Sequence, residues 1–412
     1  MARTIFNSRG EETIEVDIIT AMGFGRASAP AGASVGRAEV PSYPEGGVRQ
    51  AVEKVTDLIT PELIGLNADL QEDIDHLLHE IDGTTNFGNI GGNVAYSISM
   101  AAAEAAATSY GVPLFQHLGG YLASELPFPL GNVLGGGRHA HGRTLDIQEF
   151  LILPLGAGSF RRAAEANIMV HQAVGTLLKK KDKSFSGGRN DEGAWSTGIK
   201  DEEALEILVA ACDKVTGELE VSCRLGIDMA ASTLWDPKKE HYLYESGRLR
   251  RDSGEQLEFI LQLVTNYDLA YVEDPFHEED FENFAELHKK TKDCLVCGDD
   301  LFVTNRKRLT DGMKTEAANA IIIKVNQIGT LTDAWETIKT ANEAEVVPVM
   351  SHRSGETNDA HIAHLAVAFR CPIIKTGIVG GSRVSKINEL IRIEKTLMDR
   401  AEMAALSLLE GK

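Results

Sequence analysis

The chain has 412 residues, of which 43% are hydrophobic and 25% are charged, a balance typical of a globular protein with room for a barrel and one smaller domain. Its 61 acidic and 41 basic residues give a formal net charge of −20, which repels nucleic acid and anionic membranes and argues against both as main partners. A small anionic substrate is not excluded, because a local cluster of cations can reverse the field inside a cleft.

Cysteine usage and the absence of long apolar runs indicate the compartment. Five scattered cysteines without a framework spacing favour a reducing environment: Cys212, Cys223, Cys294, Cys297 and Cys371. Cys294 and Cys297 form a lone CxxC in an apolar run, so we expect buried structural thiols rather than redox or metal chemistry. Charges interrupt the N-terminal apolar residues, and no run approaches the ~20 apolar residues of a membrane span. We therefore expect a cytoplasmic protein.

The first part of the chain reads as strands followed by helices. Residues 3–28 alternate apolar and polar in short runs, which predicts antiparallel strands. Residues 28–37, ASAPAGASVG, have the composition of a mobile loop. Helical patterns follow at about 47–59, at about 69–80 and from Val94. Together these elements predict an N-terminal α+β capping domain over residues 1–125.

From residue 126, after which Pro127 and Pro129 mark a boundary, short apolar runs alternate with helical stretches. The runs are EFLILP, VSCRLGID, LAYVED, CLVCGDD, AIIIKVN, VVPVMSH and CPIIKTG. Strands that alternate with helices imply a parallel sheet. Six clear runs after residue 220 and one or two before it favour a closed, TIM-like α/β barrel over residues 126–412.

Six of these runs carry a charged or polar residue at or near the end of the strand. The residues are Asp228, Glu273, Asp299, Lys324, His352 and Lys375. After the first interval, each step along the chain is about one strand and one helix long. In a β/α barrel the carboxyl ends of the strands open onto one face, so the six side chains should converge on one pocket. Three carboxylates suit octahedral Mg²⁺, and two lysines with a histidine suit an anionic substrate.

Each of the six has an ordinary structural explanation when taken alone. An Asp at a strand end often caps the following helix, and a single Lys is usually a solvated rim residue. Capping does not readily produce six such residues in register, so the pattern favours a metal-dependent active site.

At this point the chain resembles the enolase family over essentially its whole length. The motifs follow the family's order: NSRG at 7–10, QEF at 148–150, NDEG at 190–193, GIDMAAS at 226–232, VEDPF at 272–276, GDDLFVTN at 298–305, IKVNQIGT at 323–330, SHRSGET at 351–357 and KTG at 375–377. The resemblance implies an enolase-type barrel, two Mg²⁺ ions and a small-molecule substrate, 2-phosphoglycerate or phosphoenolpyruvate. It also implies a homo-oligomer, a dimer or an octamer.

The resemblance also implies a role for each matching residue. Asp228, Glu273 and Asp299 are implied as ligands of the first Mg²⁺, with Ser34 completing the second site when the loop closes. Lys324 is implied as the general base and Glu192 as the general acid, with Glu149 and His352 near the leaving hydroxyl. Implied substrate contacts are Arg353 and Ser354 to the phosphate, Lys375 to the carboxylate, and Gln148 and His139 along the pocket.

The chemistry explains why these residue types are needed. The proton lost next to a carboxylate leaves dense negative charge, which divalent cations stabilise. The base must be a neutral amine, so we expect Mg²⁺ and Lys375 to lower the pKa of Lys324. Glu192 needs the opposite shift in pKa, so that it holds a proton at neutral pH.

Three of these assignments have an ordinary alternative explanation. His139 has an equally placed rival in His141, Glu192 is also explained as a turn acid, and Ser34 as a loop serine. Several positions depart from the family pattern: Asn7, Glu11, Glu12, Ala31, Ala194 and the segment 378–383, which is one residue short and lacks an arginine. These departures bear on loop closure and on the fit of the substrate.

Two other functions compete with this assignment. A related dehydratase would act on another carboxylate substrate, but such members usually carry a Lys-x-Lys pair on the second barrel strand, where EFLILP has no lysine. A binding protein with lost turnover would be expected to lack some of the six strand-end residues, and all six are present.

Overall fold

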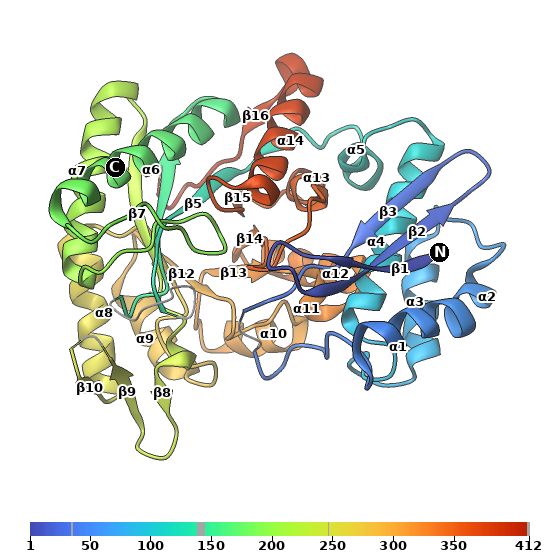
Figure 1. The fold of residues 1–412 in the computed structure, drawn as a ribbon, viewed down its shortest axis with the longest axis horizontal. Helices are drawn as coiled ribbons and strands as arrows, with labels where there is room; N and C mark the ends of the chain where they lie inside the picture. The colour runs from blue at the N-terminus through green and yellow to red at the C-terminus, as the bar shows by residue number, and fades with distance from the viewer. Residues whose placement is uncertain (34–35, 138–144, 246, 410–412) are drawn as a thin grey trace.

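The computed structural model describes residues 1–33, 36–137, 145–245 and 247–409. Figure 1 shows two parts side by side, a sheet with helices built from the first 120 residues or so and a larger barrel built from the rest. His139 and Ser34 lie outside the described residues, so their predicted roles stay predictions.

The N-terminal part is a three-stranded antiparallel sheet followed by helices, as the alternating pattern predicts. The strands are β1 (Ala2–Phe6), β2 (Glu12–Ile19) and β3 (Phe24–Ser28), in the order β1-β2-β3. The helices are α1 (Gly47–Lys54), a π-helical turn (Val55–Ile59), α2 (Thr60–Leu63), α3 (Gln71–Asp82), α4 (Gly92–Ser109) and α5 (Leu114–Gly119).

The alanine-rich helix α4 lies against the sheet and is buried along most of its length. Its small side chains let the backbone of β3 approach closely: a Cβ on Gly25 would lie only 2.0 Å from the carbonyl oxygen of Ala101. A helix that is apolar on nearly all sides is expected to be buried. This helix therefore joins the sheet to the rest of the molecule.

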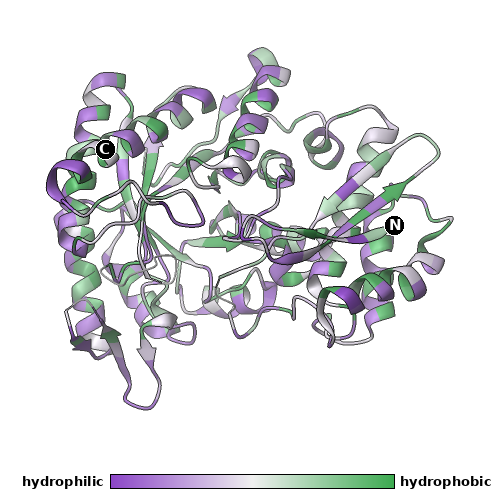
Figure 2. Ribbon diagram, viewed as in Figure 1, coloured by the Kyte–Doolittle hydropathy of each residue, from purple (hydrophilic) through white to green (hydrophobic). Residues whose placement is uncertain are grey.

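Eight strands close the barrel in the order β5-β6-β7-β11-β12-β13-β14-β15. They are β5 (Phe128–Gly135), β6 (Glu149–Leu155), β7 (Ser222–Asp228), β11 (Tyr271–Glu273), β12 (Leu295–Gly298), β13 (Ala320–Ile323), β14 (Val347–Ser351) and β15 (Ile373–Lys375). Figure 2 shows these strands as largely hydrophobic, whereas the outer helices alternate between apolar and polar residues. The barrel fold predicted from the sequence is confirmed.

The expectation of an entirely parallel sheet is wrong at one strand. β6 runs antiparallel to both of its neighbours, with Glu149 paired to Asp228 and Leu155 to Ser222. Because β6 is reversed, its first residues, rather than its last, lie at the rim where the other strands end. Apolar alternation with helices does not carry strand direction, so the sequence pattern could not detect this reversal.

Helices surround the barrel. They are α6 (Phe160–Lys181), α7 (Asp201–Leu219), α8 (Ser253–Tyr267), α9 (Phe281–Lys290), α10 (Arg306–Lys314), α11 (Val325–Ile328), α12 (Leu331–Glu343), α13 (His361–Ala368) and α14 (Gly381–Leu397). Small strands complete the chain: β4 (Glu125–Leu126) pairs with β16 (Glu402–Met403), and β8 (Trp235–Asp236), β9 (His241–Tyr244) and β10 (Leu249–Arg251) form a separate sheet.

Two further expectations concern thiols and membranes. All five cysteines are free and buried, and burial raises the pKa of Cys294 and Cys297, which agrees with inert structural thiols. Within the described residues, no helix combines the length and the apolar character of a membrane span.

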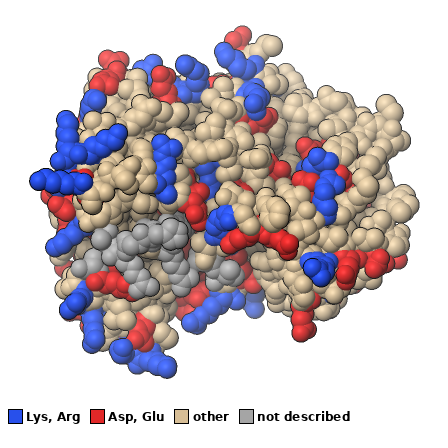
Figure 3. All heavy atoms as spheres, in the orientation of Figure 1, with Lys and Arg blue, Asp and Glu red and all other residues tan. Residues whose placement is uncertain are grey.

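Figure 3 shows basic and acidic side chains interspersed over the barrel side of the molecule.

Candidate active site

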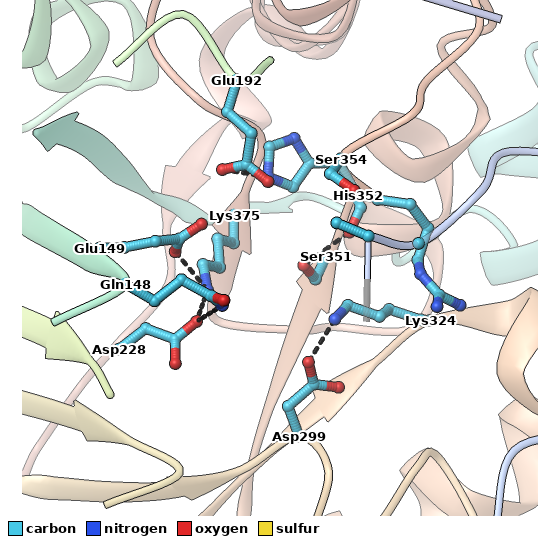
Figure 4. A pocket seen from close by; sticks show the side chains of 13 residues that line it. Gln148, Glu149, Glu192, Asp228, Asp299, Lys324, Ser351, His352, Ser354 and Lys375 are labelled. Carbon is cyan, nitrogen blue, oxygen red and sulfur yellow. Dashed lines mark hydrogen bonds and ion pairs between the residues drawn. The ribbon is translucent and has the colours of Figure 1, made fainter. Parts of the chain in front are cut away.

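A cavity of about 360 Å³, including its open mouth, lies at the rim where the barrel strands end. The residues that line it come from strand ends, from the segments after them and from the loop that follows β3: Gly32, Ala33, Gln148, Glu149, Glu192, Asp228, Asp299, Lys324, Ser351, His352, Arg353, Ser354 and Lys375 (Figure 4). Of the six strand-end residues predicted to converge, five line this cavity directly. The sixth, Glu273, contacts Lys375 at its floor.

The reversed strand β6 explains how Gln148 and Glu149 reach the cavity. Glu149 begins β6 and pairs in register with Asp228, which ends β7. The side-chain amide of Gln148 donates a hydrogen bond to Asp228 Oδ2 over 3.3 Å. Residues from the start of one strand and from the ends of its neighbours thus share one rim.

Lys375 is the central cation of the site. Its Nζ lies 2.7 Å from Glu149 Oε2, 2.8 Å from Glu273 Oε2 and 3.2 Å from Asp228 Oδ2. Burial opposes the charged form of the amine, but the carboxylates outweigh it and hold the pKa of Lys375 well above its ordinary value. The three carboxylates therefore favour the charged form of Lys375 at the cavity floor.

The negative charge of this region exceeds what Lys375 compensates. Asp228 and Glu273 end the adjacent strands β7 and β11 in register, and Asp299 follows the next strand, β12. Burial and then the neighbouring carboxylates, with Asp228 first, raise the pKa of Glu273 well above its ordinary value, even though Lys375 acts against this shift. Hard oxygen donors with surplus negative charge fit a divalent cation such as Mg²⁺.

A second close grouping of acidic oxygens comprises Asp274, Asp299 and Asp300. Asp274 is already used structurally, because its two carboxylate oxygens accept hydrogen bonds from the backbone amides of Asp299 and Asp300. Asp274 thereby orients the segment that presents Asp299 to the cavity. We assign it this supporting role rather than that of a ligand.

Lys324 follows β13 and forms an ion pair with Asp299. Burial opposes its charge, but Asp299 and, more weakly, Glu273 overcome that effect, and the pKa of Lys324 lies above its ordinary value. Asp299 therefore outweighs the lowering expected from Lys375, and the lowering expected from Mg²⁺ stays a prediction. The physical reason is that Asp299 is in contact, whereas Lys375 is a smaller and opposing influence.

Glu192 and His352 lie together on the opposite side of the cavity from Lys324 (Figure 4). Glu192 accepts a hydrogen bond from the amide of Asn132 over 2.9 Å, and its Oε2 lies 3.6 Å from His352 Nε2. The side-chain oxygen of Asn190 accepts hydrogen bonds from the backbone N–H groups of Glu192 and Ala194. These bonds shape the turn that carries Glu192 inward. Burial followed by the charge of Arg383 lowers the pKa of His352 to about 4, so the imidazole is neutral.

Arg353 and Ser354 lie in the segment after β14 and line the cavity, as expected. The guanidinium of Arg353 donates to Asn326 Oδ1 over 3.1 Å and to Glu39 Oε2 over 3.0 Å. Ala31 and Gly355 exchange both backbone hydrogen bonds, which holds the loop that begins after β3 against this segment. Ala31 thus serves through its backbone, which explains how alanine is tolerated at this position of the loop.

Sequence reasoning missed residues that support the site, among them Glu39, Asn132 and Arg383. Glu39 lies in the N-terminal part and Asn132 inside a barrel strand, where nothing in the local pattern separates them from ordinary polar residues. Arg383 lies within the very segment noted for lacking an arginine. Only the fold brings it onto His352.

Comparison with known proteins gives a consistent result. The family model "Enolase, N-terminal domain" matches residues 1–118, and "Enolase, C-terminal TIM barrel domain" matches residues 123–410. Among curated proteins, the enolase of Methanothermobacter thermautotrophicus is 53% identical over 396 residues, which is 96% of this chain and 95% of that protein. The enolase of Methanosphaera stadtmanae is 52% identical over 96% of both chains, and that of Pyrobaculum aerophilum is 48% identical over 95% of this chain and 94% of its own.

Proposed function

The chain belongs to the enolase family, and from that premise we propose that its barrel cavity interconverts 2-phosphoglycerate and phosphoenolpyruvate, as a hydro-lyase of glycolysis and gluconeogenesis. One observation carries the proposal: Lys324 and Glu192 face one cavity from opposite sides, and Lys375 lines the same cavity (Figure 4). Elimination of water needs a base at one carbon and an acid at the neighbouring hydroxyl, and this arrangement supplies both.

Asp228, Glu273 and Asp299 would hold one Mg²⁺, and Ser34 would complete the site of a second, so that two ions serve each active site. The surplus buried negative charge around Glu273 supports the first of these sites. When bound at the substrate carboxylate, the metal supplies electrostatic stabilisation of the negative charge that develops there.

Lys324 acts as the general base that accepts the proton from C2. A lysine can do so only as a neutral amine, and the Asp299 carboxylate that now favours its charged form is also a proposed metal ligand. A metal ion held by Asp299 would therefore weaken the effect of this carboxylate on Lys324 and favour the neutral amine.

Glu192 acts as the general acid that delivers a proton to the departing hydroxyl, with Glu149 and His352 beside that hydroxyl. Support comes from the contacts that hold Glu192: Asn132 donates to it, and the neutral His352 ring lies 3.6 Å away. A positioned acid of this kind contributes about 10²–10⁴-fold to a rate.

Three cations bind the substrate's anionic groups or fix the groups that do. Lys375 pairs with the carboxylate, while Arg353 and Ser354 bind the phosphate. Gln148 lines the remaining wall, and His139 keeps the substrate-contacting role that the family resemblance implies. Arg9 supports the phosphate side, since its guanidinium donates to Gly32 O over 3.1 Å and to Ser354 Oγ over 3.4 Å. The site thus offers separate positive charges to the two ends of a phosphorylated acid.

The two competing functions are not favoured. Full-length relatives at 43–53% identity carry the name enolase, and the six strand-end residues converge at one rim. A related dehydratase or a binding protein with lost turnover explains neither the phosphate-side cations nor the opposed lysine and glutamate.

We further propose that the chain is a cytoplasmic homo-oligomer, a dimer or an octamer. Among the described residues the outer strand β1 pairs only with β2, and Phe6 on β1 is 70% exposed; Ile19, at the end of β2, and Met22, in the turn after it, are 64% and 81% exposed. Exposed apolar residues beside an open strand edge favour association. Light scattering after gel filtration tests this, and a monomer at micromolar concentration would contradict it.

The activity is tested by following the ultraviolet absorbance of phosphoenolpyruvate after 2-phosphoglycerate and Mg²⁺ are added. We expect a rise that stops when excess chelator is added and resumes with more Mg²⁺. Folded protein that gives no rise under these conditions would contradict the proposal.

A further inference from the structure

Arg383 is a buried arginine on α14 whose guanidinium contacts His352 and the backbone of two loops at the cavity. Its side chain is only 1% exposed. The guanidinium donates to His352 Nδ1 over 2.6 Å, to Arg353 O over 2.7 Å, to Ser354 O over 2.5 Å and to Asp191 O over 3.1 Å. His352 and Asp191 lie beside the proposed acid Glu192, and Arg353 and Ser354 are the proposed phosphate-binding residues.

The contact to His352 determines which nitrogen of that ring carries a proton. An arginine is always protonated and can only donate, so His352 Nδ1 must be the acceptor. The proton of the neutral ring therefore resides on Nε2, which is the nitrogen 3.6 Å from Glu192 Oε2. Arg383 thus directs an N–H group towards the proposed general acid.

The contacts to carbonyl oxygens join two loops. Asp191 immediately precedes Glu192, whereas Arg353 and Ser354 form the phosphate side of the cavity. The planar fork of an arginine can bridge several acceptors in one fixed geometry, which the compact ammonium of a lysine cannot reproduce. Arg383 therefore sets the separation between the acid loop, which carries Asp191 and Glu192, and the phosphate loop, which carries Arg353 and Ser354.

The local backbone leaves room for this side chain. Gly377 has a positive φ of 73°, and a Cβ on it would lie 2.8 Å from Glu192 O and 3.2 Å from Arg383 Cγ. The space that a larger residue would fill is thus taken by the stem of Arg383 and the backbone of the acid loop.

We propose that Arg383 is a positioning residue for the leaving-group half of the reaction, which fixes the Nε2–H tautomer of His352 and holds the Glu192 loop against the phosphate loop. The inference rests on the proposed function, because it assigns Glu192 and His352 to the departing hydroxyl. It predicts that loss of Arg383 slows loss of the hydroxyl while proton abstraction by Lys324 continues.

The test compares two rates in Arg383→Met and Arg383→Lys with Mg²⁺ present. One rate is the replacement of deuterium at C2 of labelled 2-phosphoglycerate by solvent hydrogen, and the other is formation of phosphoenolpyruvate. In Arg383→Met we expect phosphoenolpyruvate formation to fall about 10²-fold, as a displaced catalytic group does, with C2 exchange largely retained. Arg383→Lys keeps the charge without the fork and should recover only part of the loss.

A second readout does not depend on activity. Nitrogen-15 NMR of the histidine rings should show Nε2–H with an accepting Nδ1 for His352 in the unmodified protein, and a mixture of tautomers in both variants. Lys386→Met is the matched control, because Lys386 is a buried cation one turn further along α14 that pairs with Glu356 and donates to Thr357 O and Asp359 O rather than to His352. We expect it to change the two rates together and to leave the His352 tautomer alone.

Equal losses of both rates in folded Arg383 variants, or an unchanged tautomer, would overturn the inference. Failure of the unmodified enzyme to exchange C2 or to form phosphoenolpyruvate would instead overturn the proposed function. In that event the NMR measurement would still decide whether Arg383 sets the tautomer.

Discussion

At the scale of single residues, the site gathers more negative charge than its own lysines balance. Lys375 contacts three carboxylates and Lys324 a fourth, yet the pKa of Glu273 remains raised by burial and by neighbouring carboxylates. An environment of this kind stores repulsion that a bound divalent cation relieves. The charge imbalance is thus a property of function and not of folding.

This imbalance predicts how metal affects stability. Mg²⁺ should raise the midpoint of thermal unfolding of the enzyme, since it binds the folded state, whereas Glu273→Gln should abolish most of that increase and all but traces of activity. Calorimetric scans with Mg²⁺ and with chelator measure the effect. Glu279→Gln, on a half-exposed carboxylate outside the cavity, is the control, and an unchanged Mg²⁺ response in Glu273→Gln would contradict the assignment.

Residues at strand ends could be predicted from the sequence because each is chemically out of place in an apolar run. Glu39 and Arg383 could not, since they reach the site from a loop and from an outer helix. They lie far along the chain from Arg353 and His352, the residues that they contact, and no repeating sequence pattern links such distant positions. Such supporting contacts become visible only when the fold is known.

At the scale of elements, the acid loop depends on a glycine packed against another loop. Gly193 has a φ of 82°, and a Cβ on it would lie 2.1 Å from Val379 O. The loop around Glu192 and the segment after Lys375 therefore approach each other through their backbones. The shortened, glycine-rich segment 378–383 is part of this contact.

Gly193→Ala should lower kcat by about 10²-fold or more, because the new methyl group pushes the Glu192 loop away from its partner. The matched control is Gly187→Ala, whose φ of 86° imposes the same backbone strain of about 1–2 kcal/mol but whose new Cβ meets no atom within 4 Å. Steady-state kinetics and denaturant unfolding separate the two effects. Equal losses of kcat in both variants would show that strain, and not the displacement of Glu192, matters.

Strand direction is the element-scale feature that the sequence pattern missed. The run EFLILP was predicted as a barrel strand, and it is one, but it enters the barrel at the catalytic rim. An apolar strand reads the same in both directions, and direction is decided by how connections pack in three dimensions. The resemblance placed Gln148 and Glu149 in the pocket where periodicity alone would have placed them at the wrong end.

At the scale of the whole molecule, buried polar contacts join the N-terminal part to the barrel. His361, at the start of α13, lies 3.5 Å from Glu104 on α4 and 3.6 Å from Asp359. Asp359 also accepts hydrogen bonds from the backbone and hydroxyl of Ser28, each over 2.8 Å, at the end of β3. The protonated ring thus holds together the junction from which the active-site loop departs.

This junction predicts a pH dependence of stability. Burial lowers the pKa of His361, but the contacts with Asp359 and Glu104 outweigh it and raise the pKa from 6.5 to about 10. A raised pKa means that the stabilisation is fully present below pH 6.5 and is lost as the pH rises towards 10. His361→Gln should therefore destabilise the protein more at pH 6.5 than at pH 10, measured by urea unfolding; an equal loss at both values would refute a charged His361.

The division of the reaction between Lys324 and Glu192 is tested most directly by one measurement, the exchange of the C2 hydrogen of 2-phosphoglycerate with solvent in Lys324→Ala and in Glu192→Gln. Both variants should form phosphoenolpyruvate at least about 10²-fold more slowly than the unmodified enzyme and should still bind Mg²⁺. Glu192→Gln should retain C2 exchange, because the base is intact, whereas Lys324→Ala should lose it. Exchange that persists in Lys324→Ala, or that disappears only in Glu192→Gln, would contradict the assignment of base and acid.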